Sequence, residues 1–382
     1  MMFIDAELIC MLFVILAISL VCIIYIRKKE AIEGKISVRS RKRRLLAVLS
    51  LTLPSAFLIF MLSLAYGPGG SMSLSETFST LISAISKGGS GLTVNEIFVY
   101  YSRLPRALGA LAVGIGLATA GVMFQAIIRN PLVDPYITGV SSGAGLAAVI
   151  GIVMGSSIGF MSGSVFMIPV MAMIGGLLAF GATMLIAEKS GGSSVNYVLG
   201  GVIVAFALSA VTTLVLTFAG DRLHGAVFWL FGSFTRIEWS NIWFLFIPAL
   251  AISFLSLFWA RELNLVLLGE DQAKQMGLNV RRFNVIVLIT ASLLTAVCVA
   301  FVGIIGFVGL VVPHMCRMVL GGDHRFVLPA SIALGGMFLL LTDFISRMIY
   351  IPYQLPVGAI TAIIGAPIFA YLLIKKGRMY DG

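Results

Sequence analysis

RELNLVLLGEDQAKQMGLNVRR, residues 261–282, is a polar island between two long apolar runs. It carries seven charged side chains, in a chain of which only 11% is charged. Gly269 is placed as an N-cap and Gly277 as the residue that follows the end of a short helix. Glu270 and Asp271 then fall in the first turn, where negative charge suits the helix dipole. The stretch predicts a compact helix that joins two membrane-spanning helices.

The predicted helix has a small apolar face and one internal charge pair. Glu270 and Lys274 are spaced i, i+4, and Ala273 and Met276 are spaced i, i+3. We expect the apolar face to press into a partner.

The composition of the remaining chain defines the class of protein. Of its 382 residues 59% are hydrophobic, more than a soluble domain holds, and the apolar runs are long enough to cross about 30 Å of hydrocarbon as helices. Their length excludes the short alternating strands of a membrane β-barrel. The net charge of +10 lies at the ends of the runs, so it indicates membrane topology and not nucleic-acid binding. The four cysteines lack CxxC spacing, so neither a disulfide framework nor a zinc site is indicated.

The first apolar run, about 8–26, is followed by nine Lys or Arg in residues 27–44. This basic linker should be cytoplasmic. No cation precedes the run, so it predicts a retained anchor with its N-terminus outside the cell and not a signal peptide.

Further spans are expected at about 45–66, 106–128, 136–154, 164–187, 197–219, 242–259, 285–303, 305–320, 327–346 and 356–374, which makes eleven. Residues 285–320 could also be one broken span. The expected inner loops hold 20 of the 26 Lys and Arg and the outer side holds 6, which predicts a cytoplasmic C-terminus. Glycine and alanine crowd several spans, as in closely packed membrane helices.

The sequence offers no obvious energy source of its own. The centres of the expected spans lack Asp, Glu, Lys and Arg, which disfavours the alternative of an ion-gradient-coupled secondary transporter. The chain also lacks GxxxxGK[ST], so it has no phosphate-binding loop. Active transport would therefore need ATP and Mg²⁺ bound by a separate subunit, with no cofactor in this chain.

Catalytic and metal sites are not indicated either. Residues 139–143 fit GxSxG, but they open an apolar helical run and not a strand-to-helix turn. The three histidines are scattered, and His314, beside Pro313, suits a structural role at a helix break.

Four separated motifs resemble the FecCD-type permeases, the membrane subunits of ATP-driven importers for ferric siderophores, haem and cobalamin. They are RLPRALGALAVGIGLATAGVMFQAIIRNPLVDPYITGVSSGAG (103–145), LGEDQAKQMGL (268–278), GFVGLVVPH (306–314) and LPVGAITAIIGAPIFAYLL (355–373). The resemblance covers about 45–378 and implies an all-α, polytopic membrane helix bundle with a ten-helix permease core. Residues 1–44 depart from it, as one extra N-terminal transmembrane helix with a basic linker.

The resemblance implies a homodimer with its pathway between the copies, two cytoplasmic ATPase subunits and an extracytoplasmic binding protein. The family's coupling helices correspond to residues 261–282, within the permease domain 45–382. The residues that would contact the ATPase are Glu270, Asp271, Ala273, Lys274, Met276 and Gly277. The alternative is an ordinary cytoplasmic loop.

The resemblance also assigns roles to polar residues at both membrane faces. Exposed guanidinium groups of Arg103, Arg106 and Arg347 would dock acidic side chains of the binding protein. The alternatives are interfacial snorkelling for the first two, and for Arg347 an ion pair with Asp343, four residues before it.

Gate and pathway roles are expected on the cytoplasmic side and along one span. The residues are Asn130, Leu132 and Ser194 at the gate, and Ser209, Thr212 and Thr213 along the pathway. Hydroxyl groups that bond back to their own helix would explain the last three equally well.

Overall fold

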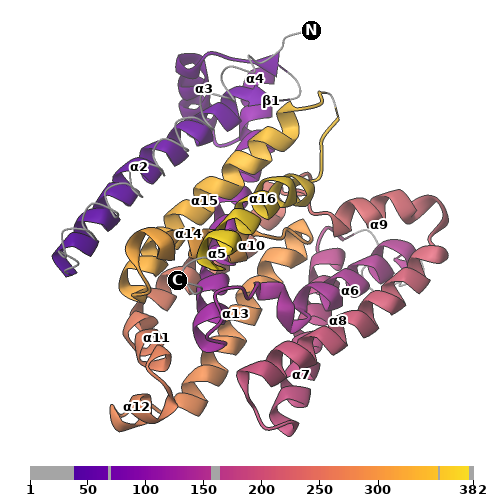
Figure 1. Cartoon of the computed structure of the whole chain (residues 1–382). Coiled ribbons are helices and arrows are strands. Elements are labelled where there is room, and N and C mark those ends of the chain that lie inside the picture. Colours follow the sequence, from indigo (N-terminus) through magenta and orange to yellow (C-terminus); the bar gives the residue numbers. More distant parts are fainter. Residues whose placement is uncertain (1–37, 68–69, 156–163, 352, 378–382) are drawn as a thin grey trace.

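The computed structural model describes residues 38–67, 70–155, 164–351 and 353–377, so the predicted span at 8–26 lies outside the described residues. The described part of the chain is a helix bundle with one short hairpin, β1 (Tyr66–Gly67) paired antiparallel with β2 (Gly70–Ser71) (Figure 1). Seven described helices are long and apolar enough to cross a membrane, and three shorter apolar helices accompany them. The count of ten plus one stays a prediction.

The seven long segments contain the helices α2 (Val38–Ala65), α5 (Leu104–Ile127), α7 (Met167–Lys189), α8 (Ser194–Thr217), α10 (Trp239–Leu255), α13 (Val280–Val302) and α15 (His324–Met348). The shorter apolar ones are α6 (Val140–Met154), α14 (Val308–Leu320) and α16 (Val357–Gly377). Each matches a predicted span to within several residues. Helix α2 begins inside the basic linker, so residues 38–44 form its first turns.

Short elements fill the connections. They are α3 (Leu74–Ser86), α4 (Val94–Ile97), the π-helix η1 (Phe98–Arg103), the 3₁₀ turns η2 (Pro135–Thr138), η3 (Gly220–Arg222) and η4 (Ser256–Trp259), α9 (Leu223–Leu230), α11 (Ala260–Leu267) and α12 (Glu270–Gln275). Helices α3 and α9 both lie outside the predicted spans.

Helix α5 is the centre of the bundle, and nearly all of its residues are buried. It contacts α10, α13, α14 and α15, while α6, α7 and α8 pack on one another beside this group (Figure 1). A Cβ atom at Gly114 would lie 2.2 Å from the carbonyl oxygen of Gly335 on α15, and one at Gly121 would lie 1.9 Å from that of Gly309 on α14. The backbones therefore touch, as the small residues predicted.

Residues 303–307 separate α13 from α14, so the predicted region 285–320 is two helices. Phe307 has φ 69°, a left-handed conformation that is unusual for a residue with a side chain. The Tyr136 hydroxyl donates to the Ile305 carbonyl oxygen at 2.9 Å and accepts from its N–H at 3.1 Å. This side chain satisfies backbone groups that no helix satisfies at the break.

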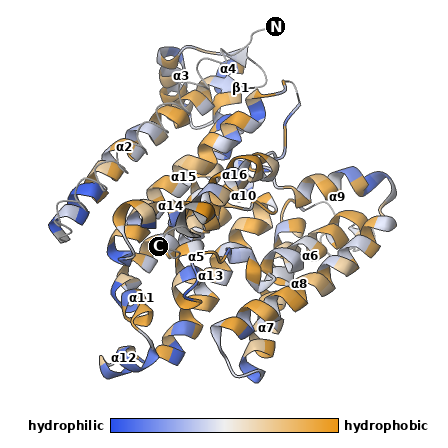
Figure 2. Cartoon of the chain, in the orientation of Figure 1, coloured by the Kyte–Doolittle hydropathy of each residue, from blue (hydrophilic) through white to orange (hydrophobic). Residues whose placement is uncertain are grey.

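The two ends of the bundle differ in chemistry. At one end, called the α12 end, the start of α2 lies beside the α14–α15 connection: Arg44 donates to the Val319 carbonyl oxygen, and Arg41 lies 4.0 Å from Asp323. The opposite end, called the α3 end, holds α3, α4 and the hairpin. Figure 2 shows hydrophilic residues at α12 and at the start of α2, and apolar residues along the outer faces of α7 and α8.

Candidate functional site

Helix α12 forms a compact knob at one end of the bundle, as the sequence predicted. Gly269 is its N-cap with φ 111°, and Gly277 follows its C-terminus with φ 87°. The Gly277 N–H donates to the Lys274 carbonyl oxygen at 2.9 Å, and the Leu278 N–H donates to that of Ala273 at 3.0 Å. These two bonds form a Schellman motif, which needs glycine at the left-handed position. Both expected capping glycines are confirmed.

The exposed surface of the knob differs in part from the predicted contact set. Glu270, Asp271, Lys274 and Gly277 are exposed, and Met276 is 63% exposed. Ala273 is fully buried within its own chain, so its assignment to the contact surface is wrong. The i, i+3 spacing with Met276 did not reveal that Ala273 faces inward.

Two exposed leucines extend this surface, although the sequence reasoning missed them. Leu267 is 44% exposed and Leu268 is 54% exposed, at the junction of α11 and α12. Both are apolar residues that close a polar, amphipathic helix, and that signal was available in the sequence. The surface formed by Leu267, Leu268, Glu270, Asp271, Lys274 and Met276 is called the knob surface below.

A hollow of ≈ 610 Å³ lies between the knob and the neighbouring helix ends. Glu270 of α12 lies 3.9 Å from Arg129, which follows α5, and Glu270 also pairs with Lys274 at 3.9 Å. On the other side of the hollow, Glu188 at the end of α7 accepts hydrogen bonds from Tyr197 at 2.5 Å and from Arg281 at 3.0 Å. One carboxylate therefore joins α7, α8 and α13 beside the knob.

The predicted gate residues lie at the start of α8 and on the loop of residues 128–134 between α5 and η2, which is called the gate loop after this prediction. The Asn130 side chain accepts a hydrogen bond from the Leu132 N–H at 3.0 Å, and both residues are exposed. The Ser194 hydroxyl lines the same hollow and donates to the Ile127 carbonyl oxygen at 3.4 Å. The structure thus brings the start of the gate loop close to Ser194.

Gln125 supports the gate loop and was not predicted. Its side chain is buried and donates to the Val133 carbonyl oxygen at 3.0 Å and to that of Gly309 at 3.2 Å, while its own oxygen accepts from Arg317. A polar residue near the end of an apolar span was the available signal. Gln125 joins the gate loop to the start of α14.

Two of the three hydroxyl groups predicted along the pathway bond back to helix α8. Thr212 donates to the Leu208 carbonyl oxygen at 2.8 Å, and Thr213 donates to that of Ser209 at 3.0 Å. Ser209 and Thr213 are exposed, and Thr212 is buried. The alternative of local hydrogen bonding is therefore confirmed for Thr212 and Thr213, and Thr212 does not face outward.

The three arginines expected to be exposed at the α3 end are buried instead. The exposed fractions are 4% for Arg103, 6% for Arg106 and 2% for Arg347, so the expectation of exposed guanidinium groups is wrong. Arg103 donates to the Leu64 and Ala65 carbonyl oxygens at 2.7 and 2.9 Å. It therefore satisfies the backbone groups at the C-terminus of α2.

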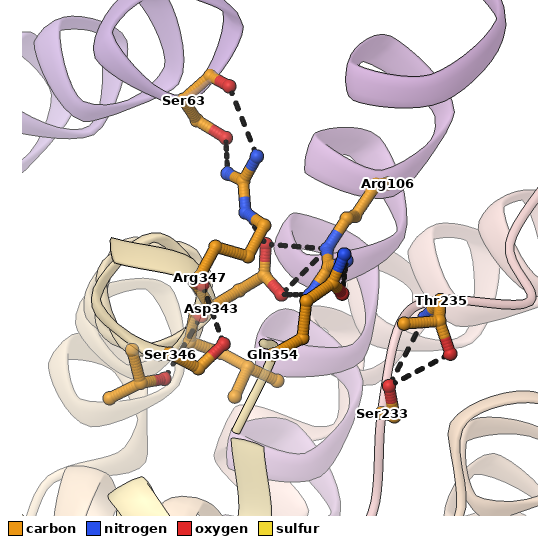
Figure 3. Close-up of polar contacts among 10 residues, drawn as sticks. Ser63, Arg106, Ser233, Thr235, Asp343, Ser346, Arg347 and Gln354 are labelled. Atoms are coloured by element: carbon orange, nitrogen blue, oxygen red, sulfur yellow. Dashed lines mark hydrogen bonds and ion pairs between the residues drawn. The ribbon is translucent and has the colours of Figure 1, made fainter. Parts of the chain in front are cut away.

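Arg106 and Arg347 share the carboxylate of Asp343 (Figure 3). Arg106 donates to it in a forked arrangement at 2.9–3.2 Å, and the Arg347 Nε atom lies 3.2 Å away. Arg347 also reaches the Ser63 hydroxyl on α2 at 2.5 Å. The predicted ion pair of Arg347 with Asp343 is confirmed, and the cluster fastens α2, α5 and α15 together.

Arg106 also borders an open hollow. It donates to the Gln354 side chain at 2.5 Å, and both residues line a hollow of ≈ 500 Å³ together with Tyr101, Glu238 and Trp239. Of the three predicted docking arginines, Arg106 alone lines this hollow.

The described residues give little support for a catalytic site. The GxSxG serines lie in helix α6, without a preceding strand. Within the described ranges, no group of three or more His, Cys, Asp or Glu could hold a metal ion.

Comparisons with known proteins agree with the membrane architecture. The cobalamin import system permease protein BtuC of Halobacterium salinarum is 39% identical over 279 residues, which cover 73% of each chain. The hemin transport system permease protein HmuU of Yersinia pestis is 35% identical over 328 residues, 85% of this chain and 96% of that protein. A solved structure of an inward-facing metal-chelate type ABC transporter is similar with a TM-score of 0.74 and 31% identity, covering 86% of this chain and 99% of that one.

The model of the FecCD transport family matches residues 55–375. With that match and two relatives named as permeases, the chain belongs to the FecCD transport family and is the multi-pass membrane subunit of an ATP-binding-cassette transporter.

Proposed function

We propose that this chain is the translocation subunit of an importer for a metal chelate such as a ferric siderophore, cobalamin or haem. The names of the relatives support this cargo class, since they refer to hemin, cobalamin and metal chelates. ATP and Mg²⁺ bind to separate ATPase subunits, and this chain contributes no cofactor. The knob surface is the observation that carries the proposal, because an exposed apolar patch rimmed by charges suits a protein partner.

The α12 end is the cytoplasmic side in this proposal, with the C-terminus inside and the N-terminus outside the cell membrane. Support comes from the basic first turns of α2, which lie beside the α14–α15 connection at this end. Cations favour the cytoplasmic side of membrane proteins. Two ATPase subunits would then reach the knob surface from the cytoplasm.

Glu270→Arg with Asp271→Arg tests this contact. The variant should insert normally but fail to capture the ATPase subunits and to drive uptake in proteoliposomes that contain ATP. The matched control is Glu76→Arg with Asp221→Arg, two exposed acids outside the knob surface. Normal ATP-driven uptake by the knob variant would refute the assignment.

The binding protein docks at the α3 end in this proposal, through an acidic side chain that enters the hollow beside Arg106. The buried guanidinium group and the polar Gln354 line that hollow and support an acidic ligand group. Gln354→Glu keeps the cluster around Arg106 but adds a negative charge to the hollow. It should weaken capture of the loaded binding protein, and Gln354→Ala is the neutral control. Unchanged capture by Gln354→Glu would count against docking there.

Two copies of the chain form the transporter, with the pathway between them. The exposed apolar side chains of α8 and α16 support this arrangement; among them are Leu199, Phe206, Leu214, Ile363 and Ile374. The exposed Ser209 and Thr213 add weakly polar positions to α8, which suits a carrier that must release its cargo. Native mass spectrometry of the purified complex should give two copies of this chain with two ATPase subunits.

The gate residues act at the cytoplasmic end of this pathway. Closure of the ATPases pushes on α12, which the contact of Glu270 with Arg129 joins to the gate loop, while the pair of Glu188 with Arg281 joins α7 to α13 on the other side of the hollow. Asn130, Leu132 and Ser194 would part when the pathway opens inward.

A further inference from the structure

Helix α3 exposes the apolar arc that an amphipathic helix ordinarily buries. The small residues Thr77 and Ala84 face the protein and are fully buried. Four large apolar side chains at i, i+4, i+8 and i+11 lie on another arc: Leu74, Phe78, Ile82 and Ile85, exposed by 43%, 53%, 53% and 56%. A surface helix in water would turn these residues toward the core.

The remaining arc of α3 is polar and short of charge. It carries Ser75, Glu76, Ser79 and Ser86, and no Lys or Arg lies within the helix. The adjacent Lys87 is paired with Glu96 at 2.8 Å. Attraction to anionic groups therefore contributes little, and burial of apolar surface is the force that this helix offers a partner.

Exposed apolar residues continue beyond α3. Val94 and Ile97 of α4, which packs against α3, are 68% and 46% exposed. The exposed apolar surface is therefore wider than one helix, and α3 also contacts the transmembrane helix α2. In Figure 1, α3 lies beside the C-terminal end of α2.

Clustered aromatic residues mark the level of α3 relative to the membrane. Tyr100 of η1 lies 5.1 Å from Trp239, ring centroid to ring centroid, and Trp239 lies 5.9 Å from Trp243. Tyr and Trp concentrate where a membrane meets water. Helix α3 packs against η1, and the Tyr101 hydroxyl donates to the Gly89 carbonyl oxygen just after α3. These contacts hold α3 at the level of the aromatic cluster.

We propose that α3 lies in the lipid interface of the leaflet at the α3 end, with Leu74, Phe78, Ile82 and Ile85 inserted at the boundary of headgroups and acyl chains. The buried arc contacts the protein, the serine arc faces water, and the apolar arc contacts lipid. The lipid anchors the end of α2 and the start of α5. This inference rests on membrane insertion of the bundle and not on the proposed cargo or partners.

Spin labels on the two arcs test the proposal in nanodiscs of zwitterionic phosphatidylcholine. Single cysteines at Phe78→Cys and Ile82→Cys probe the apolar arc, and Ser79→Cys is the matched control on the serine arc, in a chain whose native cysteines are replaced by alanine. Labels at 78 and 82 should collide freely with oxygen and several-fold less with a water-soluble nickel chelate, and the label at 79 should show the reverse. Equal nickel access at 78 and 79 would overturn the proposal. Protection of 78 only after a binding protein is added would assign the arc to a protein partner instead.

Acidic substitutions keep the test independent of labelling. Phe78→Glu with Ile82→Glu should lower the thermal unfolding midpoint in nanodiscs by several degrees and change it little in detergent. Ser75→Glu with Ser79→Glu should leave both midpoints unchanged. An equal loss for the first pair in nanodiscs and in detergent would mean that the arc packs on protein, and it would contradict the lipid assignment.

Discussion

Replacing Asp343 with asparagine leaves the buried guanidinium groups of Arg106 and Arg347 without their shared carboxylate. The Asp343 side chain is fully buried, and those of Arg106 and Arg347 are 7% and 2% exposed, so water screens the two cations poorly. Removing one member of a buried ion pair costs about 3–5 kcal/mol, because the partner stays charged and buried. Since two cations lose one anion here, we expect a loss of unfolding free energy of about 5 kcal/mol, the upper part of that range.

The measurement is the free energy of unfolding in bicelles, by steric trapping or by reversible titration with a denaturing detergent. Glu270→Gln is the control, because the ion pairs of Glu270 are 3.9 Å long and exposed, and such pairs contribute less than about 1 kcal/mol. Replacing Asp343, Arg106 and Arg347 together with leucine should recover most of the loss, since apolar packing can replace a buried ion cluster. A cost for Asp343→Asn no larger than that of the control would refute the reasoning.

Three further predictions concern smaller contacts. A cleavable cross-linker that joins the thiols of Glu188→Cys and Arg281→Cys should stop uptake, and cleavage of the linker should restore it. Unchanged uptake by the cross-linked protein would show that α7 and α13 need not separate at this ion pair. The Lys87 ammonium lies 2.8 Å from the Glu96 carboxylate and is the main reason that the pKa of Glu96 is lowered from 4.5 to about 2. The ionised carboxylate therefore stabilises the α3–α4 corner above pH 4.5, and this stabilisation is lost as the pH falls toward 2. Hydrogen exchange of this corner, corrected for intrinsic rates, should therefore accelerate below pH 4.5 in the parent and not in Glu96→Gln. Gln125→Leu should lower the free energy of unfolding by about 1–3 kcal/mol, because it leaves buried carbonyl oxygens without donors. Limited proteolysis should then cut the gate loop faster than in the parent. Equal cleavage rates would contradict the role of Gln125 in positioning this loop.

Much of the bundle was readable from local sequence signals. Apolar runs of span length gave the long helices, and the capping glycines at 269 and 277 gave the boundaries of α12. Both signals are local: a helix in lipid must satisfy its own backbone, and a left-handed residue favours glycine wherever it occurs.

Burial at the ends of the helices was not readable in the same way. The sequence could not tell whether Arg103 and Arg106 point to water, because their partners are carbonyl oxygens of α2 and a carboxylate 237 residues away in sequence. The inward direction of Ala273 depends likewise on the contact of α12 with its neighbours. Such contacts are set by the tertiary packing and produce no periodic pattern in the sequence.

The alternatives that the sequence left open were decided by hydrogen bonds. Thr212 and Thr213 bond to their own helix, a local arrangement that any apolar helix offers to a hydroxyl group. The pairing of Arg347 with Asp343 follows from their i, i+4 spacing. The third member of that cluster, Arg106, required the fold.

The glycine contacts of α5 limit how a movement of α12 can be transmitted through the bundle. At Gly114 and Gly121 the backbone of α5 touches those of α15 and α14 so closely that a single methyl group would collide. Helices interlocked in this manner cannot slip past each other without first separating, which would forfeit their dispersion contacts. The three therefore act as a solid frame, and displacement at α12 must be taken up by parts of the chain outside it, such as the α6–α7–α8 group and the loops that join it to α5.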